Sequence, residues 1–530
     1  MTEGGPDPSD HTVLGTEDLL ARSMTDIFGQ LHMLVRNEAR DELVERLQAH
    51  LGADPRGLPV VNHELPPYQL VDVQVALEAW VTLGPLREFE LIGVSGDQRR
   101  FHPLSELLSQ GRNFGVGIGP VEYVSCADSA TSTRSCVRFG IFLMRDGDRR
   151  VAALLRGDDP HGPMQSAMLE LIGPDPAYVE ETLAELRQLA VERSVLRGQV
   201  LALGPGEGHQ YGALRFMPRP SLSRDQLVLP DLTLGQIERH VVRIAVHGER
   251  LQAAGQHLKR GVLLYGPPGT GKTHTVRYLL SELPEVTAFI LSGQSLGLIG
   301  MACGMARLLQ PSIVILEDVD LIAGDRSFGP MGSNPLLFEV LNQIDGLGDD
   351  VDVTFLLTTN RVDILERALA ERPGRVDAAV EIAPPDADGR SRLFRLYGTG
   401  LGLAELTDEN LSAAIAATEG RTATYIREVV RRAAIIAAEE HETGPLRVDS
   451  RMLADAAHEL LDDRAALTRS LLGEPLEPDA EPPFPAGPGS RPPGAGPTIM
   501  SGMPSGIRWA RRGARRGPGQ GPPVPFGPEE

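Results

Sequence analysis

The feature that most constrains this 530-residue chain is an eight-residue phosphate-binding loop. A short apolar run, Val262–Tyr265, comes directly before the loop, and a helical pattern of apolar residues follows it. This is the G-x-x-x-x-G-K-[ST] signature in the strand–loop–helix context that it requires. The pattern predicts a nucleotide-binding α/β domain. The loop consists of Gly266, Pro267, Pro268, Gly269, Thr270, Gly271, Lys272 and Thr273.

The residue types in this loop suit a polyphosphate. Glycines let backbone N–H groups turn inward onto phosphate oxygens, and the start of the following helix adds partial positive charge. Lys272 is expected to reach the β- and γ-phosphates, and the Thr273 hydroxyl is expected to bind Mg²⁺. We therefore predict a nucleotide and Mg²⁺ as the cofactors.

A second apolar run, Ser312–Leu316, ends in two adjacent carboxylates, Glu317 and Asp318. Carboxylates at the C-terminal end of a parallel strand face the ligand crevice of an open α/β sheet. Two adjacent acids suit metal-assisted hydrolysis, in which one holds Mg²⁺ and the other orients and activates the attacking water. The sequence thus predicts a hydrolytic site between these acids and the phosphate loop.

Five segments in order resemble the motifs of the AAA (AAA+) family of P-loop ATPases. The resemblance implies an ATP hydrolase with a parallel α/β sheet and a C-terminal helical lid. The segments are RGVLLYGPPGTGKT (Arg260–Thr273), PSIVILEDVDLI (Pro311–Ile322), LNQIDGL (Leu341–Leu347), FLLTTNRVDILERALAERPGRVD (Phe355–Asp377) and TEGRTATYIREVVRRAA (Thr418–Ala434).

The resemblance also implies roles for three further residues. Asn360 matches the polar sensor that positions water near the γ-phosphate, so we expect it to be catalytic. Arg372 and Arg375 match the arginine fingers, which stabilise charge on the transferring phosphoryl group of a neighbouring subunit. Fingers that act on a neighbour imply a homo-oligomeric ring, typically a hexamer, that remodels a protein or protein complex.

The chain departs from the family pattern at four places, one of which is an extra residue between Leu369 and Arg372. Its acids run Glu317 then Asp318, whereas the usual order is Asp then Glu; a similar reversed order occurs in the Bcs1-like branch. The match puts Glu317 at the metal position and Asp318 at the water position. The segment 298–300, Leu-Ile-Gly, replaces the aromatic-hydrophobic-Gly of chain-threading members, so we expect at most a weak grip on a polypeptide. Ala423 and Thr424 replace the lid's usual Gly-Ala.

Composition and periodicity outside the motifs predict the domain organisation. Apolar residues spaced three or four residues apart up to Leu51 predict helices, and two apolar runs around residues 145–148 predict a β-hairpin. The proline- and glycine-rich C-terminus cannot bury enough apolar surface to fold. We expect a flexible tail at 1–16, an N-terminal helical segment and α/β (or α+β) domain for client or partner binding at 17–224, the ATPase α/β subdomain at 225–385, the helical lid at 386–465, and a disordered tail at 473–530.

Charge and cysteine content restrict the possible partners and the cellular compartment. With 51 basic and 72 acidic residues the formal charge is −21, which argues against non-specific binding to nucleic acid or anionic membranes. The three cysteines, Cys126, Cys136 and Cys303, fit a reducing compartment. The N-terminal residues do not read as a signal peptide, and no run approaches the about 18 apolar residues needed to span a bilayer. We therefore predict a cytoplasmic protein with no membrane partner.

Three alternatives stay open. Residues 360–363, Asn-Arg-Val-Asp, resemble the guanine-reading N-K-x-D motif of GTPases, although Arg replaces Lys. The reversed acids also fit an ATP-controlled binding or scaffold module with negligible turnover. Finally, the arginines around Trp509 could bind nucleic acid or an acidic partner, or form a solvated tail.

Overall fold

The computed structural model describes the chain between residues 41 and 461, with gaps. The predicted tails, the apolar pattern before residue 41, Arg372 and Arg375 lie outside the described residues. The described ranges are 41–96, 99–110, 115–158, 166–204, 213–320, 342–343, 346, 348, 351–361, 376–403, 406–440 and 443–461.

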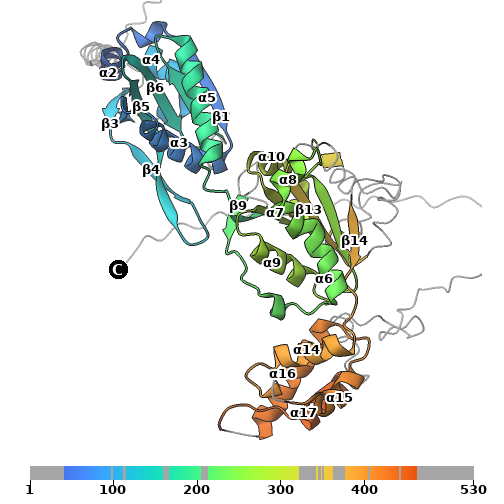
Figure 1. Cartoon of the computed structure of the whole chain (residues 1–530). Helices are drawn as coiled ribbons and strands as arrows, with labels where there is room; N and C mark the ends of the chain where they lie inside the picture. The colour runs from blue at the N-terminus through green and yellow to red at the C-terminus, as the bar shows by residue number, and fades with distance from the viewer. Residues whose placement is uncertain are drawn as a thin grey trace, which may run out of the picture. The chain divides into compact units, whose positions relative to one another are not determined.

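The N-terminal part is an antiparallel sheet covered by helices on both faces (Figure 1). Its strand order is β1-β7-β6-β5-β2-β3, and β4 pairs with β5. Helices α3 and α5 pack on one face, and α2 and α4 pack on the other. The bounds are α2 Glu42–Leu51, β1 Val60–Leu65, α3 Leu70–Thr82, β2 Arg87–Ser95, α4 Leu104–Gln110, β3 Gly117–Gly119, β4 Glu122–Ala127, β5 Thr133–Asp146, β6 Arg149–Arg156, β7 Ala167–Ile172 and α5 Pro176–Glu192.

Strand β5 shows how the sequence builds two cores on one sheet. Successive side chains of a strand point to opposite faces. Phe142 and Met144 therefore pack under α3 and α5, whereas Ile141 and Leu143 pack under α2 and α4. The predicted hairpin is confirmed: β5 pairs with β6 up to Asp146↔Arg149. Gly147 in its turn has φ 61°, a value that glycine adopts readily.

The second sheet is the predicted parallel α/β sheet. Its order is β14-β10-β13-β12-β11-β8-β9, and every pairing is parallel except β8–β9. Both faces are covered, because η7 and α10 pack on one and α6, η6 and α9 pack on the other. The bounds are β8 Val200–Gly204, β9 Ala213–Met217, α6 Asp231–Glu238, η6 Arg239–Arg243 (a π-helical turn), β10 Arg260–Tyr265, α9 Lys272–Glu282, β11 Thr287–Ser292, η7 Gly293–Leu298, α10 Ile299–Leu308, β12 Ser312–Glu317, β13 Val353–Thr359 and β14 Ala378–Glu381.

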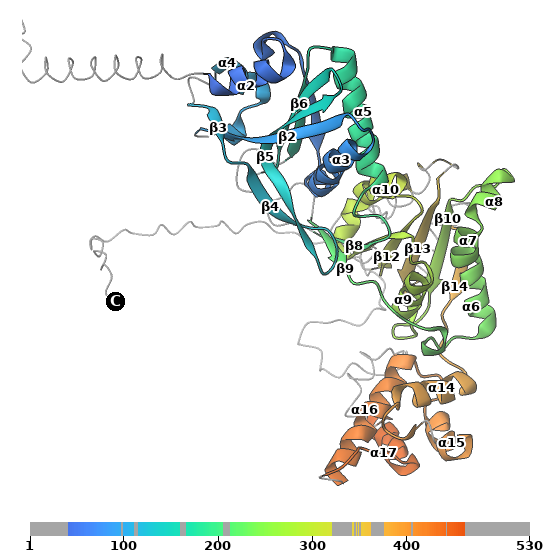
Figure 2. The same ribbon diagram turned by 60° about the vertical axis from the view of Figure 1, so that its left-hand side comes forward.

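The hairpin β8–β9 corrects the predicted boundary at Asp225. A boundary at Asp225 places both strands in the N-terminal domain, yet they form the edge of the second sheet beyond β11 (Figure 2). Val200 pairs with Ala288 of β11, so the sheet begins before residue 225. A short apolar run does not reveal which sheet edge it joins, because backbone pairing to β11 is a long-range contact.

Four helices form the region predicted as a lid. They enclose a core of their own that includes Phe394, Tyr425 and Leu453. The side chain of Asp386 caps α14 by accepting from Gly389 N, and Thr407 caps α15 by accepting from Asn410 N. The bounds are α14 Ala387–Tyr397, α15 Asp408–Ala417, α16 Ala423–Glu440 and α17 Ser450–Leu461.

The remaining elements are short connections. Among the described residues, none of the helices has the length and apolar character required to cross a membrane. The short elements are η1 Pro55–Gly57, η2 Pro67–Gln69, η3 Arg99–Phe101, η5 Arg224–Gln226, α7 Ile244–Val246 and α8 Gly248–Ala253.

Candidate nucleotide-binding site

The phosphate loop connects the end of β10 to the start of α9, as the sequence predicts. Gly266 has φ 145° and Gly269 has φ 80°, in the region that L side chains rarely adopt. A Cβ at Gly266 would lie 2.3 Å from the carbonyl oxygen of Ile382, and one at Gly269 would lie 2.7 Å from Thr424 Oγ1. The glycines therefore make a narrow backbone cradle that a side chain would fill.

Lys272 lies at the first position of α9 and points back to the loop. Its Nζ donates hydrogen bonds of 2.8 Å to the carbonyl oxygens of Gly266 and Pro267. The side chain is buried, and burial lowers the pKa of Lys272 to about 8, although the charges of Asp318 and Asp320 raise it in part. A buried ammonium beside a backbone cradle fits an anionic phosphate. The negative charge of the phosphate would stabilise the protonated amine, which burial disfavours.

Thr273 and Glu317 lie side by side, although 43 residues separate them in sequence. The Thr273 hydroxyl donates a hydrogen bond to the Glu317 carboxylate at the end of β12. Burial raises the pKa of Glu317, the neighbouring Asp318 raises it further, and Arg277 lowers it. A hydroxyl and a carboxylate oxygen at one point form the oxygen donor set that Mg²⁺ prefers. These two residues fit the predicted cation.

Asp318 and Asn360 meet across the ends of two neighbouring strands. Strands β12 and β13 are parallel and paired, so their C-terminal ends lie at the same edge of the sheet. Asn360 Nδ2 donates to Asp318 Oδ1 at 3.3 Å. The structure thus brings the two residues together, beside the strand end that carries Glu317.

Asp320 is a buried acid at this edge that the sequence analysis missed. Its Oδ1 accepts hydrogen bonds from Thr359 Oγ1 at 2.9 Å and from the backbone N–H of Asn360 at 3.0 Å. The available signal was its place in the acidic run of residues 317–320, Glu-Asp-Val-Asp. That signal does not show which of the acids contacts the neighbouring strand.

The lid contacts the phosphate loop through Thr424. Its backbone N–H and its Oγ1 both donate to the carbonyl oxygen of Gly269, at 3.1 and 3.2 Å. Thr424 replaces the family's usual alanine, so its hydroxyl adds a contact that alanine lacks. The first turn of α16 is therefore attached directly to the loop.

Two other expectations have different outcomes. Arg372 and Arg375 lie outside the described residues, so their placement stays a prediction. The weak grip expected from the segment 298–300 is not supported, because Ile299 is fully buried in the core beneath α10 and Leu298 packs against the same core. Ile299 faces inward because it starts α10 on the side of the helix that packs on the sheet.

Comparison with known proteins agrees with this geometry. A family model described as "ATPase family associated with various cellular activities (AAA)" matches residues 262–384. These residues form an AAA ATPase domain. The match includes the phosphate loop, both acids and Asn360, and it confirms the P-loop α/β fold predicted from the sequence.

The chain is also similar to individual proteins that are named as ATP-dependent metalloproteases or as a proteasome regulatory subunit. The chain is 34% identical over 207 residues to the "ATP-dependent zinc metalloprotease FtsH" of Mycobacterium bovis, covering 37% of this chain and 27% of the relative. It is 32% identical over 238 residues to the protein of that name from Thermus thermophilus, covering 42% and 37%. It is 33% identical over 207 residues to the "26S proteasome regulatory subunit 8 homolog" of Schizosaccharomyces pombe, covering 34% and 50%. The similarity therefore spans half or less of each relative.

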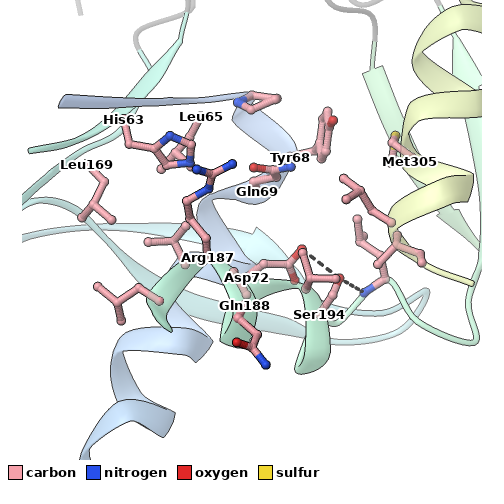
Figure 3. Close-up of a pocket in the computed structure, with 18 of the residues that line it drawn as sticks. His63, Leu65, Tyr68, Gln69, Asp72, Leu169, Arg187, Gln188, Ser194 and Met305 are labelled. Carbon is pink, nitrogen blue, oxygen red and sulfur yellow. Dashed lines mark hydrogen bonds between the residues drawn. The ribbon is translucent and has the colours of Figure 1, made fainter. Parts of the chain in front are cut away.

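A hollow of about 510 Å³ is lined by none of the residues assigned to the nucleotide site. Residues of β1, α3, α5 and α10 line it, and Asp72 and Ser194 face each other inside it (Figure 3). Asp72 accepts hydrogen bonds from Ser194 Oγ at 2.8 Å and from Val195 N at 2.9 Å. Both carboxylate oxygens therefore hold the segment that leaves α5, which gives this acid a structural role.

Proposed function

We propose that the chain is a Mg²⁺-dependent ATP hydrolase. The observation that supports this most strongly is the meeting of the phosphate loop with the ends of β12 and β13. One edge of the sheet carries a buried lysine, a hydroxyl–carboxylate pair and an acid–amide pair. These groups match the needs of phosphoryl transfer to water: charge neutralisation, metal binding and water activation.

Each residue has a defined part in the proposed reaction. Lys272 and the backbone N–H groups of the loop bind the β- and γ-phosphates and orient the γ-phosphate. Thr273 and Glu317 would hold Mg²⁺, which would neutralise phosphate charge. Asp318 accepts a proton from the attacking water, and Asn360 orients the same water through its amide. The AAA match favours ATP over GTP as the nucleotide.

We further propose that the chain works as a homo-oligomeric ring on a protein client. The family resemblance supports a ring because Arg372 and Arg375 match residues that act on a neighbour's nucleotide. The names of the relatives, a protease and a proteasome subunit, favour a protein as the client. Peptidase activity is not part of the proposal, since the sequence contains no His-Glu-x-x-His zinc motif.

Steady-state ATP hydrolysis with and without Mg²⁺ tests the enzymatic proposal. Lys272→Ala should abolish nucleotide binding or turnover, because it removes the buried charge opposite the phosphates. Lys259→Ala, at a half-buried position outside the loop, is the matched control and should hydrolyse ATP like the parent. A parent chain that binds ATP but does not turn it over would support the binding-module alternative, and a fully active Lys272→Ala variant would refute the site assignment.

A mixing experiment tests the ring. Arg372→Ala or Arg375→Ala should retain ATP binding and lose turnover. Mixing either variant with Lys272→Ala should restore some activity, because each chain supplies what the other lacks. Mixed assemblies that form without recovering activity at any ratio would contradict a site shared between subunits.

A further inference from the structure

Asp318 has an unusual backbone conformation. It is the one non-glycine residue with positive φ among the described residues, at 51°. Most side chains avoid this left-handed region because Cβ approaches the following carbonyl oxygen. Asp and Asn adopt it several-fold more often than other non-glycine residues, since their short polar side chains can bond locally. The position therefore disfavours a longer acid.

Thr358 of the neighbouring strand holds this conformation from two sides. Its Oγ1 accepts a hydrogen bond from the backbone N–H of Asp318 at 3.0 Å. Its carbonyl oxygen accepts a hydrogen bond from the N–H of Val319, also at 3.0 Å. The regular β12–β13 ladder ends at Leu316↔Leu357, so a hydroxyl replaces the backbone acceptor where the chain turns. Thr358 is buried, which limits the ability of water to take over this bond.

Asp320 holds the backbone of Asn360, which is the hydrogen-bond partner of Asp318. By accepting from Thr359 Oγ1 and from the N–H of Asn360, it anchors the backbone from which the Asn360 amide reaches Asp318. Thr358 and Asp320 thus act on opposite sides of one contact: Thr358 orients the acid, and Asp320 orients the amide. Neither residue needs to touch the nucleotide to do so.

We propose that Thr358 and Asp320 are positioning residues of the hydrolytic site, and that the left-handed backbone they support selects aspartate over glutamate at position 318. The inference rests on the proposed ATPase function and explains the reversed acid order by backbone geometry. The proposal predicts the effect of exchanging Glu317 and Asp318. Exchanging the two acids does not improve the site, because glutamate at 318 is poorly suited to this conformation and its longer side chain displaces the contact with Asn360.

Thr358→Val tests the positioning role, because valine keeps the shape of threonine and removes the acceptor. We expect kcat to fall about 10- to 100-fold, the range that a misplacement of about 1 Å can produce. KM for ATP and the affinity for a fluorescent ATP analogue should change less than about twofold, since ground-state binding does not use this bond. Thr358→Ser restores the hydroxyl and should recover most of the lost turnover.

Thr354→Val is the matched control for Thr358→Val. Thr354 is a buried threonine of the same strand, four residues before Thr358 and away from the acids. It should leave kcat and KM unchanged. A Thr358→Val chain as active as the Thr354→Val chain would overturn the positioning role of Thr358.

The double variant Glu317→Asp/Asp318→Glu tests the selection of aspartate independently of how well Thr358→Val folds. We expect kcat at least about tenfold below the parent with ATP still bound. Turnover equal to or above the parent would overturn the inference while leaving the proposed function intact. A parent chain that binds ATP without hydrolysing it would refute the proposed function, and with it any catalytic role for this contact.

Discussion

Asp72 provides a prediction that runs against the usual effect of removing a hydrogen-bonded charge. The side chain is 4% exposed, and burial raises its pKa from the ordinary 3.8 to about 6, against the opposing effects of Ser194, Val195 and Arg197. At 1.36 kcal/mol for each pH unit, the ionised carboxylate destabilises the fold by about 3 kcal/mol at neutral pH. We therefore expect Asp72→Asn to stabilise the protein at pH 7.5.

The hydrogen bonds around residue 72 tolerate this change. An asparagine oxygen can still accept from Val195 N, and its amide can donate to Ser194 Oγ, because a hydroxyl both donates and accepts. Ser194 Oγ already accepts from Leu196 N at 3.2 Å and has a second lone pair available. After allowing for the desolvation of the amide, the expected gain is about 1–3 kcal/mol.

The contribution of Asp72 to the free energy of unfolding depends on pH. Since the folded pKa of Asp72 is raised, the folded state holds its proton more tightly than the unfolded state between pH 3.8 and about 6. The contribution of Asp72 to stability is therefore greatest below pH 3.8 and is lost as pH rises through about 6. The advantage of Asp72→Asn should grow over that window and remain constant above it.

Urea unfolding followed by tryptophan fluorescence measures this effect. The chain has two tryptophans, and a Trp509→Phe background leaves Trp80, which is 1% exposed and lies in α3, the helix that also carries Asp72. Asp148→Asn, at an exposed turn position, controls for the loss of one charge. An Asp72→Asn chain that is less stable than the parent at pH 7.5, or a stability difference that does not change between pH 4 and pH 7.5, would refute the reasoning.

Four further substitutions test the AAA site and the N-terminal core. Asp318→Asn should retain Mg·ATP and stop hydrolysis, whereas Glu317→Gln should weaken Mg²⁺ dependence and nucleotide affinity. Mg²⁺ titrations and measured turnover distinguish the two variants. The reverse result would exchange the roles of the two acids. Gly266→Ala should reduce ATP affinity measured by a fluorescent analogue, because its Cβ would lie 2.3 Å from a carbonyl oxygen. Glu170→Ala should destabilise the N-terminal part by about 3–5 kcal/mol in the same urea assay, since it removes the carboxylate 3.0 Å from the buried Arg156 guanidinium and the acceptor of the Leu104 N–H. A loss below about 1 kcal/mol would contradict this.

The sequence by itself determined the parts of the protein that are local. The phosphate loop is one continuous strand–loop–helix segment, so glycine spacing and the position of Lys272 suffice to predict it. The β5–β6 hairpin is similar, because a Gly147 turn between two apolar runs fixes the pairing of neighbouring strands. The two carboxylates at the end of β12 were also predictable, because Glu317 and Asp318 are consecutive in the sequence.

The tertiary structure decided everything that depends on contacts between distant segments. The sequence did not show that β8 joins the second sheet, that Ile299 is buried, or that Asp320 holds the backbone of Asn360. The left-handed turn at Asp318 likewise depends on Thr358, a residue of the neighbouring strand. The physical reason is common to all four: a hydrogen bond or a buried face joins residues about 40 to 90 positions apart only after strands pair and helices pack, and residue spacing contains no record of that pairing.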